Sequence, residues 1–216
     1  MDAAPARPTD PTADRPAERQ LTQRGEERRK QLMAYAAHRF AENGFHPTSV
    51  AEITEGLGVG KGVFYWYFQS KDELLQAILT DAQRDLRRRQ KAALEGATSA
   101  TDRIERGIRA SMEWSIEHRD YFRLFQFAAT DERFSEGLRK GESVAVRDAA
   151  KQVAEAIDAG EIAPGDPILL SEALLGVHTH LVHLVHRGVV EPTDDMVDTT
   201  VAFCLYGLLG RPAPEA

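Results

Sequence analysis

The sequence predicts an all-α protein with a small N-terminal three-helix head and a larger helical C-terminal domain. From about residue 25 to residue 209, apolar residues recur at three- and four-residue steps, and no segment shows the alternating pattern of a strand. Glycine, proline and capping residues divide this pattern into segments of helix length. The chain has 216 residues, of which 42% are hydrophobic, so it can bury a core of this kind.

Composition limits the cellular setting. The single cysteine, Cys204, excludes an intrachain disulfide framework and fits a reducing cytoplasm. The longest uninterrupted apolar runs reach about half of the ~20 residues that a membrane-spanning helix needs, and no signal-peptide core follows the N-terminus. We therefore expect a cytoplasmic protein with no membrane partner.

The net charge of −7 is unevenly distributed along the chain. Residues 1–91 carry 15 Lys and Arg against 13 Asp and Glu, whereas residues 92–216 carry 12 against 21. A DNA-binding surface needs positive charge only where phosphates approach. A head that is slightly basic on an acidic body is therefore compatible with DNA binding.

Residues 1–22 contain four prolines and no apolar periodicity, which predicts a disordered tail. The head then spans residues 23–69, and its first helix carries an apolar stripe that includes Leu32, Ala36 and Phe40 and ends near Gly44. Basic residues gather at the start of this helix: Arg24, Arg28, Arg29 and Lys30. Their unfavourable interaction with the helix dipole can be offset either by solvent or by a nearby phosphate.

Two short helices follow. Thr48 or Ser49 can cap a helix that ends at Gly58, and Gly60 can cap a second one over residues 61–68. Two short helices joined by a tight glycine turn are the physical requirement of a helix-turn-helix, whose second helix enters the major groove.

A helical wheel divides the second of these helices into two faces. Phe64 and Phe68 share a face that belongs in the core, while Gly62 and Trp66 lie opposite and Val63, Tyr65 and Tyr67 flank them. An exposed glycine and indole fit DNA, because the glycine permits close approach and the indole can cover a thymine methyl group. Groups expected to reach phosphates are Thr48, Ser49, Tyr65, Tyr67 and Lys71.

Residues 48–75, TSVAEITEGLGVGKGVFYWYFQSKDELL, resemble the DNA-binding segment of TetR-family transcriptional regulators. The resemblance implies a bacterial homodimer, usually a repressor, that leaves a palindromic operator when a small molecule binds the larger domain. It places Lys61, Gly62, Val63 and Trp66 on groove-facing positions, and Ser49, Tyr65, Tyr67 and Lys71 on phosphate-contacting ones. Thr54, Gly60 and Phe64 depart from the common residues of the family, and Ala51 lacks a side chain that could read a base.

The second domain, expected to bind a ligand and to dimerise, spans residues 70–216. A connecting helix over residues 70–91 opens it, with Ser70 and Glu73 forming a capping box. Further helices are predicted over residues 101–118, 120–130, 141–159, 167–187 and 193–209.

Six aromatic residues between positions 114 and 134 indicate a core that can also line a cavity for a small apolar ligand. Trp114, Phe125 and His178 are the candidate wall residues. By resemblance, the last two helices form the dimer seam through Leu181, Leu184, Val201, Leu205 and Leu208.

Four histidines, His178, His180, His183 and His186, lie on one helix. No two are four residues apart and no carboxylate follows at ligand spacing, so we expect interface or core histidines rather than a metal site. No cofactor is predicted.

Two other functions fit the sequence less well. A helical enzyme is disfavoured because the chain lacks a phosphate-binding glycine loop, a nucleophile elbow and a zinc-protease motif. A helical adaptor would leave Gly62 and Trp66 unexplained. The sequence therefore favours a DNA-binding regulator.

Overall fold

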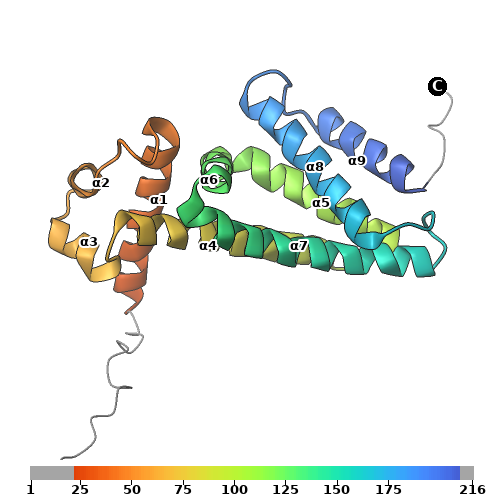
Figure 1. The fold of residues 1–216 in the computed structure, drawn as a ribbon, viewed down its shortest axis with the longest axis horizontal. Helices are drawn as coiled ribbons and strands as arrows, with labels where there is room; N and C mark the ends of the chain where they lie inside the picture. The colour runs from red at the N-terminus through yellow and green to blue at the C-terminus, as the bar shows by residue number, and fades with distance from the viewer. Residues whose placement is uncertain (1–21, 210–216) are drawn as a thin grey trace, which may run out of the picture.

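The computed structural model describes residues 22–209, and in that part of the chain it contains helices and no strands (Figure 1). The helices are α1 (Gln23–Asn43), α2 (Val50–Gly56), α3 (Lys61–Tyr67), α4 (Lys71–Ala93), α5 (Ala100–Glu117), α6 (Arg119–Thr130), α7 (Glu132–Asp158), α8 (Pro167–His186) and α9 (Asp194–Leu209). The predicted all-α fold is therefore confirmed. Most of the predicted N-terminal tail, residues 1–21, lies outside the described residues.

One predicted helix boundary is wrong. The helix expected over residues 141–159 begins nine residues earlier, at Glu132, and continues through Gly137 and Gly141. Gly141 is accommodated because α7 passes so close to α4 that a Cβ there would overlap the side chain of Gln83. The glycine marks a close helix contact, not a helix end.

The head consists of α1, α2 and α3, and α4 leads from it into the body (Figure 1). The start of α4 is capped nearly as predicted. The Ser70 hydroxyl accepts from the Glu73 amide at 3.0 Å, whereas the Glu73 carboxylate accepts from the amide of Gln69, one residue before the cap, at 2.5 Å.

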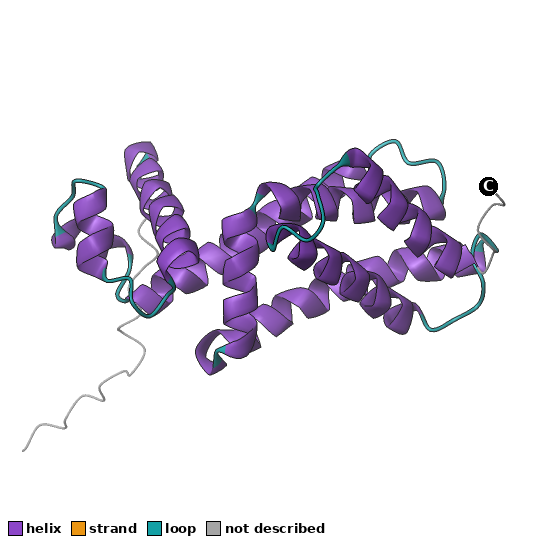
Figure 2. Ribbon diagram, turned by 90° about the horizontal axis from the view of Figure 1, so that it is seen from above, coloured by secondary structure: helices purple, strands orange, loops and turns teal. Residues whose placement is uncertain are grey.

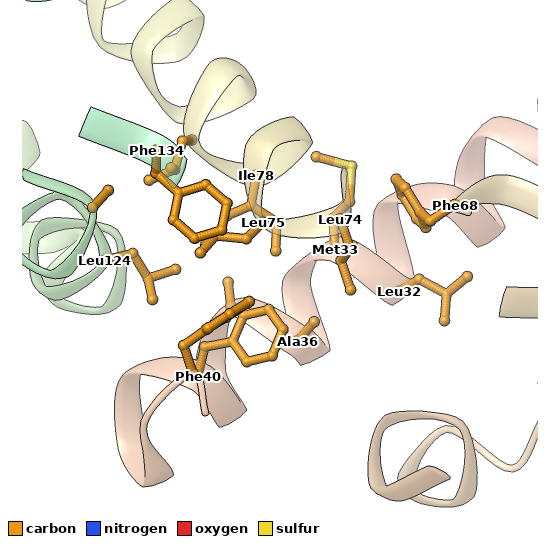
Figure 3. Close-up of a cluster of buried hydrophobic side chains, with 14 of the residues drawn as sticks. Leu32, Met33, Ala36, Phe40, Phe68, Leu74, Leu75, Ile78, Leu124 and Phe134 are labelled. Atoms are coloured by element: carbon orange, nitrogen blue, oxygen red, sulfur yellow. The ribbon is translucent and has the colours of Figure 1, made fainter. Parts of the chain in front are cut away.

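A single hydrophobic cluster joins the head to the body (Figure 3). Leu32 and Phe40 from α1 meet Leu75 from α4, and Leu124 from α6 and Phe134 from α7 close the same cluster. The core of the head is thus continuous with that of the first body helices, across the predicted domain boundary after residue 69.

A second cluster fills the far end of the body, where α8 and α9 lie beside α5 (Figure 1). Figure 2 shows the described residues from above, as helices joined by loops. Its members include Met112, Val153 and Val201. By length and composition α8 is apolar enough to cross a membrane, yet few of its residues are buried within this chain. Much apolar surface on α8 is therefore left without a partner in the monomer.

Candidate nucleic-acid interface and body cavities

The turn between α2 and α3 has the geometry that a helix-turn-helix needs. Ser49 caps α2, its hydroxyl accepting from the Glu52 amide at 3.1 Å. Gly58 adopts φ +65°, a left-handed conformation that costs L-residues energy, and so lets the chain reverse directly after α2. Gly60 then begins α3 without a side-chain cap.

Arg39 fixes α2 against α1. Its guanidinium donates to one oxygen of the Glu52 carboxylate from Nε at 2.9 Å and from Nη2 at 2.5 Å. This bond holds the pKa of Glu52 below its usual value. The pair orients α2 and, through the glycine turn, the helix that follows it.

The two faces of α3 have opposite environments. Phe64 is completely buried and Phe68 nearly so, whereas Trp66 and Tyr65 are 52% and 56% exposed. A Cβ built on Gly62 would meet no atom within 4 Å, so packing within the chain does not require a glycine there. The helix therefore presents its glycine and indole outward, as the wheel predicts.

A groove runs between the start of α1 and the outer face of α3. Its volume is about 470 Å³, and it is lined by Thr22, Arg24, Gly25, Arg28, Gly62, Val63, Trp66 and Tyr67. Two of the basic residues whose role the sequence leaves open, Arg24 and Arg28, therefore lie beside the recognition face. The run of basic residues at the start of α1 is the sequence feature that could have identified these two arginines.

The structure corrects two of the predicted phosphate contacts. The hydroxyl of Thr48 is buried and donates to the carbonyl of Gly44 at 2.9 Å, which closes the turn between α1 and α2. The ammonium of Lys71 faces inward and donates to the carbonyls of Phe45 (2.7 Å), His46 (3.2 Å) and Thr48 (2.8 Å). All three of its donors are used within the chain, and burial lowers the pKa of Lys71.

The remaining predicted contacts stay accessible. Ser49, Lys61 and Tyr65 are exposed, and Val63 and Tyr67 are half-buried at the edge of the groove. Of the sequence-predicted set, Gly62, Val63, Trp66 and Tyr67 thus line one groove, while the other exposed members lie outside its lining.

The body contains two neighbouring cavities of about 170 and 220 Å³. They share five lining residues: Gln90, Ser111, Ala145, Leu175 and His178. Of the predicted wall residues, His178 lines both cavities and Phe125 lines the larger one. Trp114 lines neither, because its indole is fully buried, stacks on His118 and donates to Asp85 at 2.8 Å.

The histidines of α8 are mostly turned towards neighbouring helices. His178 lies within 3.3 Å of the Ser111 carbonyl, His183 lies 2.6 Å from the amide of Gln126, and His186 lies 2.9 Å from the carbonyl of Ser115. His180 is exposed.

The predicted seam residues on α8 and α9 differ in exposure. Leu181, Leu184 and Leu205 are half-buried, but Val201 is only 3% exposed and lies in the second core cluster, which contradicts its placement in an interface. The side chain of Leu208 lies outside the described residues. Sequence reasoning missed Phe203 on α9, which is 66% exposed, and Leu169 on α8, which is 67% exposed.

A short helix that is packed at a fixed angle and exposes its polar and aromatic face, carried by an all-helical body with internal cavities, defines a helix-turn-helix DNA-binding protein. The profile described as "Bacterial regulatory proteins, tetR family" matches residues 32–78.

Sequence relatives agree with this class. The chain is 24% identical over 158 residues to the uncharacterized HTH-type transcriptional regulator YhgD of Bacillus subtilis, covering 72% of this chain and 83% of that protein. It is 35% identical over 92 residues to the HTH-type transcriptional repressor KstR2 of Mycolicibacterium smegmatis, covering 43% and 44% of the two chains.

Solved structures show the same fold. A TetR family transcription regulator from Marinobacter aquaeolei superposes with a TM-score of 0.75 at 20% identity, covering 87% of this chain and 98% of that one. The ketosteroid regulator KstR2 of Mycobacterium tuberculosis gives 0.69 at 22%, covering 88% and 97%. Residues 32–78 match the TetR family model, and the relatives and solved structures are described as regulators of the same kind, so the comparisons all point to a TetR family transcriptional regulator.

Proposed function

We propose that this protein is a homodimeric repressor that reads a palindromic operator with α3 and releases it when a small molecule occupies the body cavities. The outward indole of Trp66, beside the open surface of Gly62, carries this proposal. Half of the indole is exposed on a helix whose buried face is already filled by Phe64, so packing does not explain it. Contact with a base or sugar of DNA would explain why this side chain is exposed.

The residues proposed to contact DNA divide by chemistry. Those that face the major groove are Lys61, Gly62, Val63 and Trp66. Those that reach phosphates are Ser49, Tyr65 and Tyr67, with Arg24 and Arg28 added from α1. Phosphate contacts position a protein on DNA but carry no sequence information, whereas base contacts specify the sequence.

The exposed apolar surface of α8 and α9 supports a second copy of this chain as the dimer partner. Phe203, Leu169 and Ile168 are 66%, 67% and 46% exposed, which is unusual for large apolar side chains on two adjacent helices. A two-fold dimer would place two α3 helices about one helical turn of DNA, ~34 Å, apart. Light scattering on Phe203→Glu should show a monomer, while Val144→Glu, an exposed valine on α7, should stay dimeric.

Repression is supported by the relative that is named a repressor, KstR2. We infer that the protein acts in the cytoplasm, on the nucleoid when bound to DNA. In a reporter strain, deletion of the gene should raise transcription from the bound promoter. A fall in transcription would instead identify an activator.

The operator can be found by selection. The full chain is used to select duplexes from a random library, and fluorescence anisotropy then compares the selected duplex with a scrambled one at several salt concentrations. We expect binding to weaken with salt as phosphate contacts are lost. Arg24→Ala should weaken binding to both duplexes equally, whereas Trp66→Ala should reduce the preference for the selected one. A chain that selects no sequence would contradict the proposal.

A further inference from the structure

The two cavities of the body border different hydrophobic cores. Leu138, on α7, lines the larger cavity and belongs to the first cluster, which joins the head to the body. Phe125, on α6, lines the same cavity and packs against the same cluster. Ile104 and Val153 line the smaller cavity and belong to the second cluster. Among the described residues, no wall residue of either cavity belongs to the cluster that borders the other one.

Each cluster extends to a different functional part of the chain. The first contains Phe40 of α1 and Phe64 of α3, so the wall of the larger cavity and the buried side of the recognition helix share one packed core. The second contains Val197 and Val201 of α9, and its described members include no residue of the head. Because close-packed interiors transmit displacement, an occupant of the larger cavity can move the head, whereas an occupant of the smaller cavity acts on α9.

The connecting helix α4 also borders the two cavities unequally. Gln83 and Leu86 line the larger cavity only, and Gln90 lines both. The smaller cavity meets α4 only at the C-terminal end of the helix, where the side chain of Gln90 donates to the hydroxyl of Ser111 at 2.7 Å. That bond anchors α4 to α5, so an occupant of the smaller cavity meets α4 at the point where the helix is held.

The wall of the larger cavity leaves little room for α4 and α7 to move independently. Gly141, on α7, lines this cavity, and a Cβ there would overlap the side chain of Gln83. The amide nitrogen Nε2 of Gln83 also lies 3.5 Å from the carbonyl oxygen of Leu138. A molecule that pushes on one of these helices therefore displaces the other as well.

We propose that the larger cavity alone controls DNA binding, and that Leu138 and Phe125 transmit its occupancy to the head. The smaller cavity acts on the core that holds α9. The inference rests on the proposed function, because it assigns the release of DNA to one of the two cavities invoked there. Leu138 and Phe125 are positioning residues, since they act through the first cluster and do not line the groove beside α3.

The chain offers a matched pair of variants that fill the cavities. Of the two cavities, Ala129 of α6 lines only the larger one, and Ala149 of α7 lines only the smaller one. Both helices contribute to the first cluster, so the choice of helix does not decide the outcome. Each alanine is replaced by leucine in the full-length protein. Fluorescence anisotropy then measures the affinity for the duplex selected above, and light scattering checks that the oligomeric state is unchanged.

The two variants should differ in their affinity for the operator. We expect Ala129→Leu to weaken operator binding at least about fivefold, and Ala149→Leu to change it by less than about twofold. An inert Ala129→Leu, or equal weakening by both variants, would overturn the inference.

A double variant tests whether Leu138 transmits the effect. Leu138→Ala removes the side chain against which an occupant would push, so the effect of Ala129→Leu should fall below about twofold in that background. If Leu138 only stabilised the fold, the effect of Ala129→Leu would be the same in both backgrounds, and the assignment of Leu138 would be overturned. Phe125→Leu provides the same comparison from α6.

Two substitutes keep the comparison decisive if a leucine variant does not fold. Gly141→Ala replaces Ala129→Leu, because its Cβ displaces Gln83 in the wall of the larger cavity. Gly107→Leu replaces Ala149→Leu, because Gly107 lines only the smaller cavity and a Cβ there meets no atom within 4 Å.

Hydrogen exchange measured by mass spectrometry examines the head without DNA. Ala129→Leu should alter the exchange of amides in α1, and Ala149→Leu should alter it in α9 but not in α1. If no operator is selected, the proposed function fails, and this exchange comparison still decides the inference. Altered exchange in α1 with both variants, or with neither, would overturn it.

Discussion

Lys71 provides a strong test of the structure, because its position allows two opposite roles. At the start of α4 it could neutralise a phosphate, but its ammonium instead donates to three carbonyls of the turn between α1 and α2 and lies 4.4 Å from the centre of the Phe45 ring. Replacing it with methionine keeps the aliphatic chain and removes the donors. We therefore expect Lys71→Met to destabilise the fold.

The size of the effect follows from the acceptors. The carbonyls of Phe45 and Thr48 are partly buried and lose their partner, at about 1–3 kcal/mol each, whereas the carbonyl of His46 is exposed and can bind water. We therefore expect the free energy of unfolding to fall by about 2–6 kcal/mol.

Urea unfolding measures this change in the free energy of unfolding. The protein concentration is kept fixed because the stability of the proposed dimer would depend on it. The matched control is Lys61→Met. Lys61 is exposed at the start of α3, so its replacement should change stability by less than about 0.5 kcal/mol while weakening DNA binding. The reasoning would be refuted if Lys71→Met unfolded at the wild-type urea concentration and lost DNA affinity as Lys61→Met does.

Three further predictions concern the turn, the cavity and the recognition helix. Gly58→Ala should lower the free energy of unfolding by about 1–2 kcal/mol because φ there is +65°, whereas Gly62→Ala, inside α3 where φ is not positive and a Cβ meets no atom within 4 Å, should be neutral or slightly stabilising; urea unfolding compares the two, and equal values would contradict the turn geometry. The pKa of His178 is depressed to about 4, so its contribution to stability is complete above pH 6.5 and is lost as pH falls towards 4, by at most about 3 kcal/mol; His178→Gln should flatten the pH dependence of unfolding in that window, and an unchanged curve would show that the imidazole is not desolvated. Trp66→Ala should leave stability within about 0.5 kcal/mol of wild type, whereas Phe64→Ala should cost about 3–5 kcal/mol; thermal unfolding of both variants checks this, and a large loss in Trp66→Ala would place the indole in the core.

The recognition helix could be predicted because its orientation is a local property. The helical repeat alone determines which residues of 61–68 lie on the buried face and which on the exposed face. In the structure Phe64 is buried and Trp66 is exposed, as the repeat predicts. The turn at Gly58 is local in the same sense, since its chemistry depends on one backbone angle.

Long-range contacts could not be predicted in this way. Lys71 meets Phe45 across 26 residues of sequence, and no pattern near either residue reveals that contact. The spacing of apolar residues on α9 likewise shows which residues share a face of the helix, but not whether that face packs against the core or against a second chain. For this reason the pattern predicts Val201 in an interface, although the residue lies in the core. Aromatic density near Trp114 predicts a core, but only helix crossing decides which ring reaches a cavity.

The continuity of the core limits how a ligand could act on DNA. Because α4 contributes Leu75 to the cluster shared with the head and Gln90 to both cavities, one rigid helix connects the two sites over 15 residues, about 22 Å at 1.5 Å per residue. A small tilt of α4 at Gln90 would therefore displace the head together with α1, and change the spacing of two α3 helices in a dimer. A ligand produces this shift only to the extent that it binds the tilted arrangement more tightly, so filling the cavity without altering the position of Gln90 would leave DNA binding unchanged.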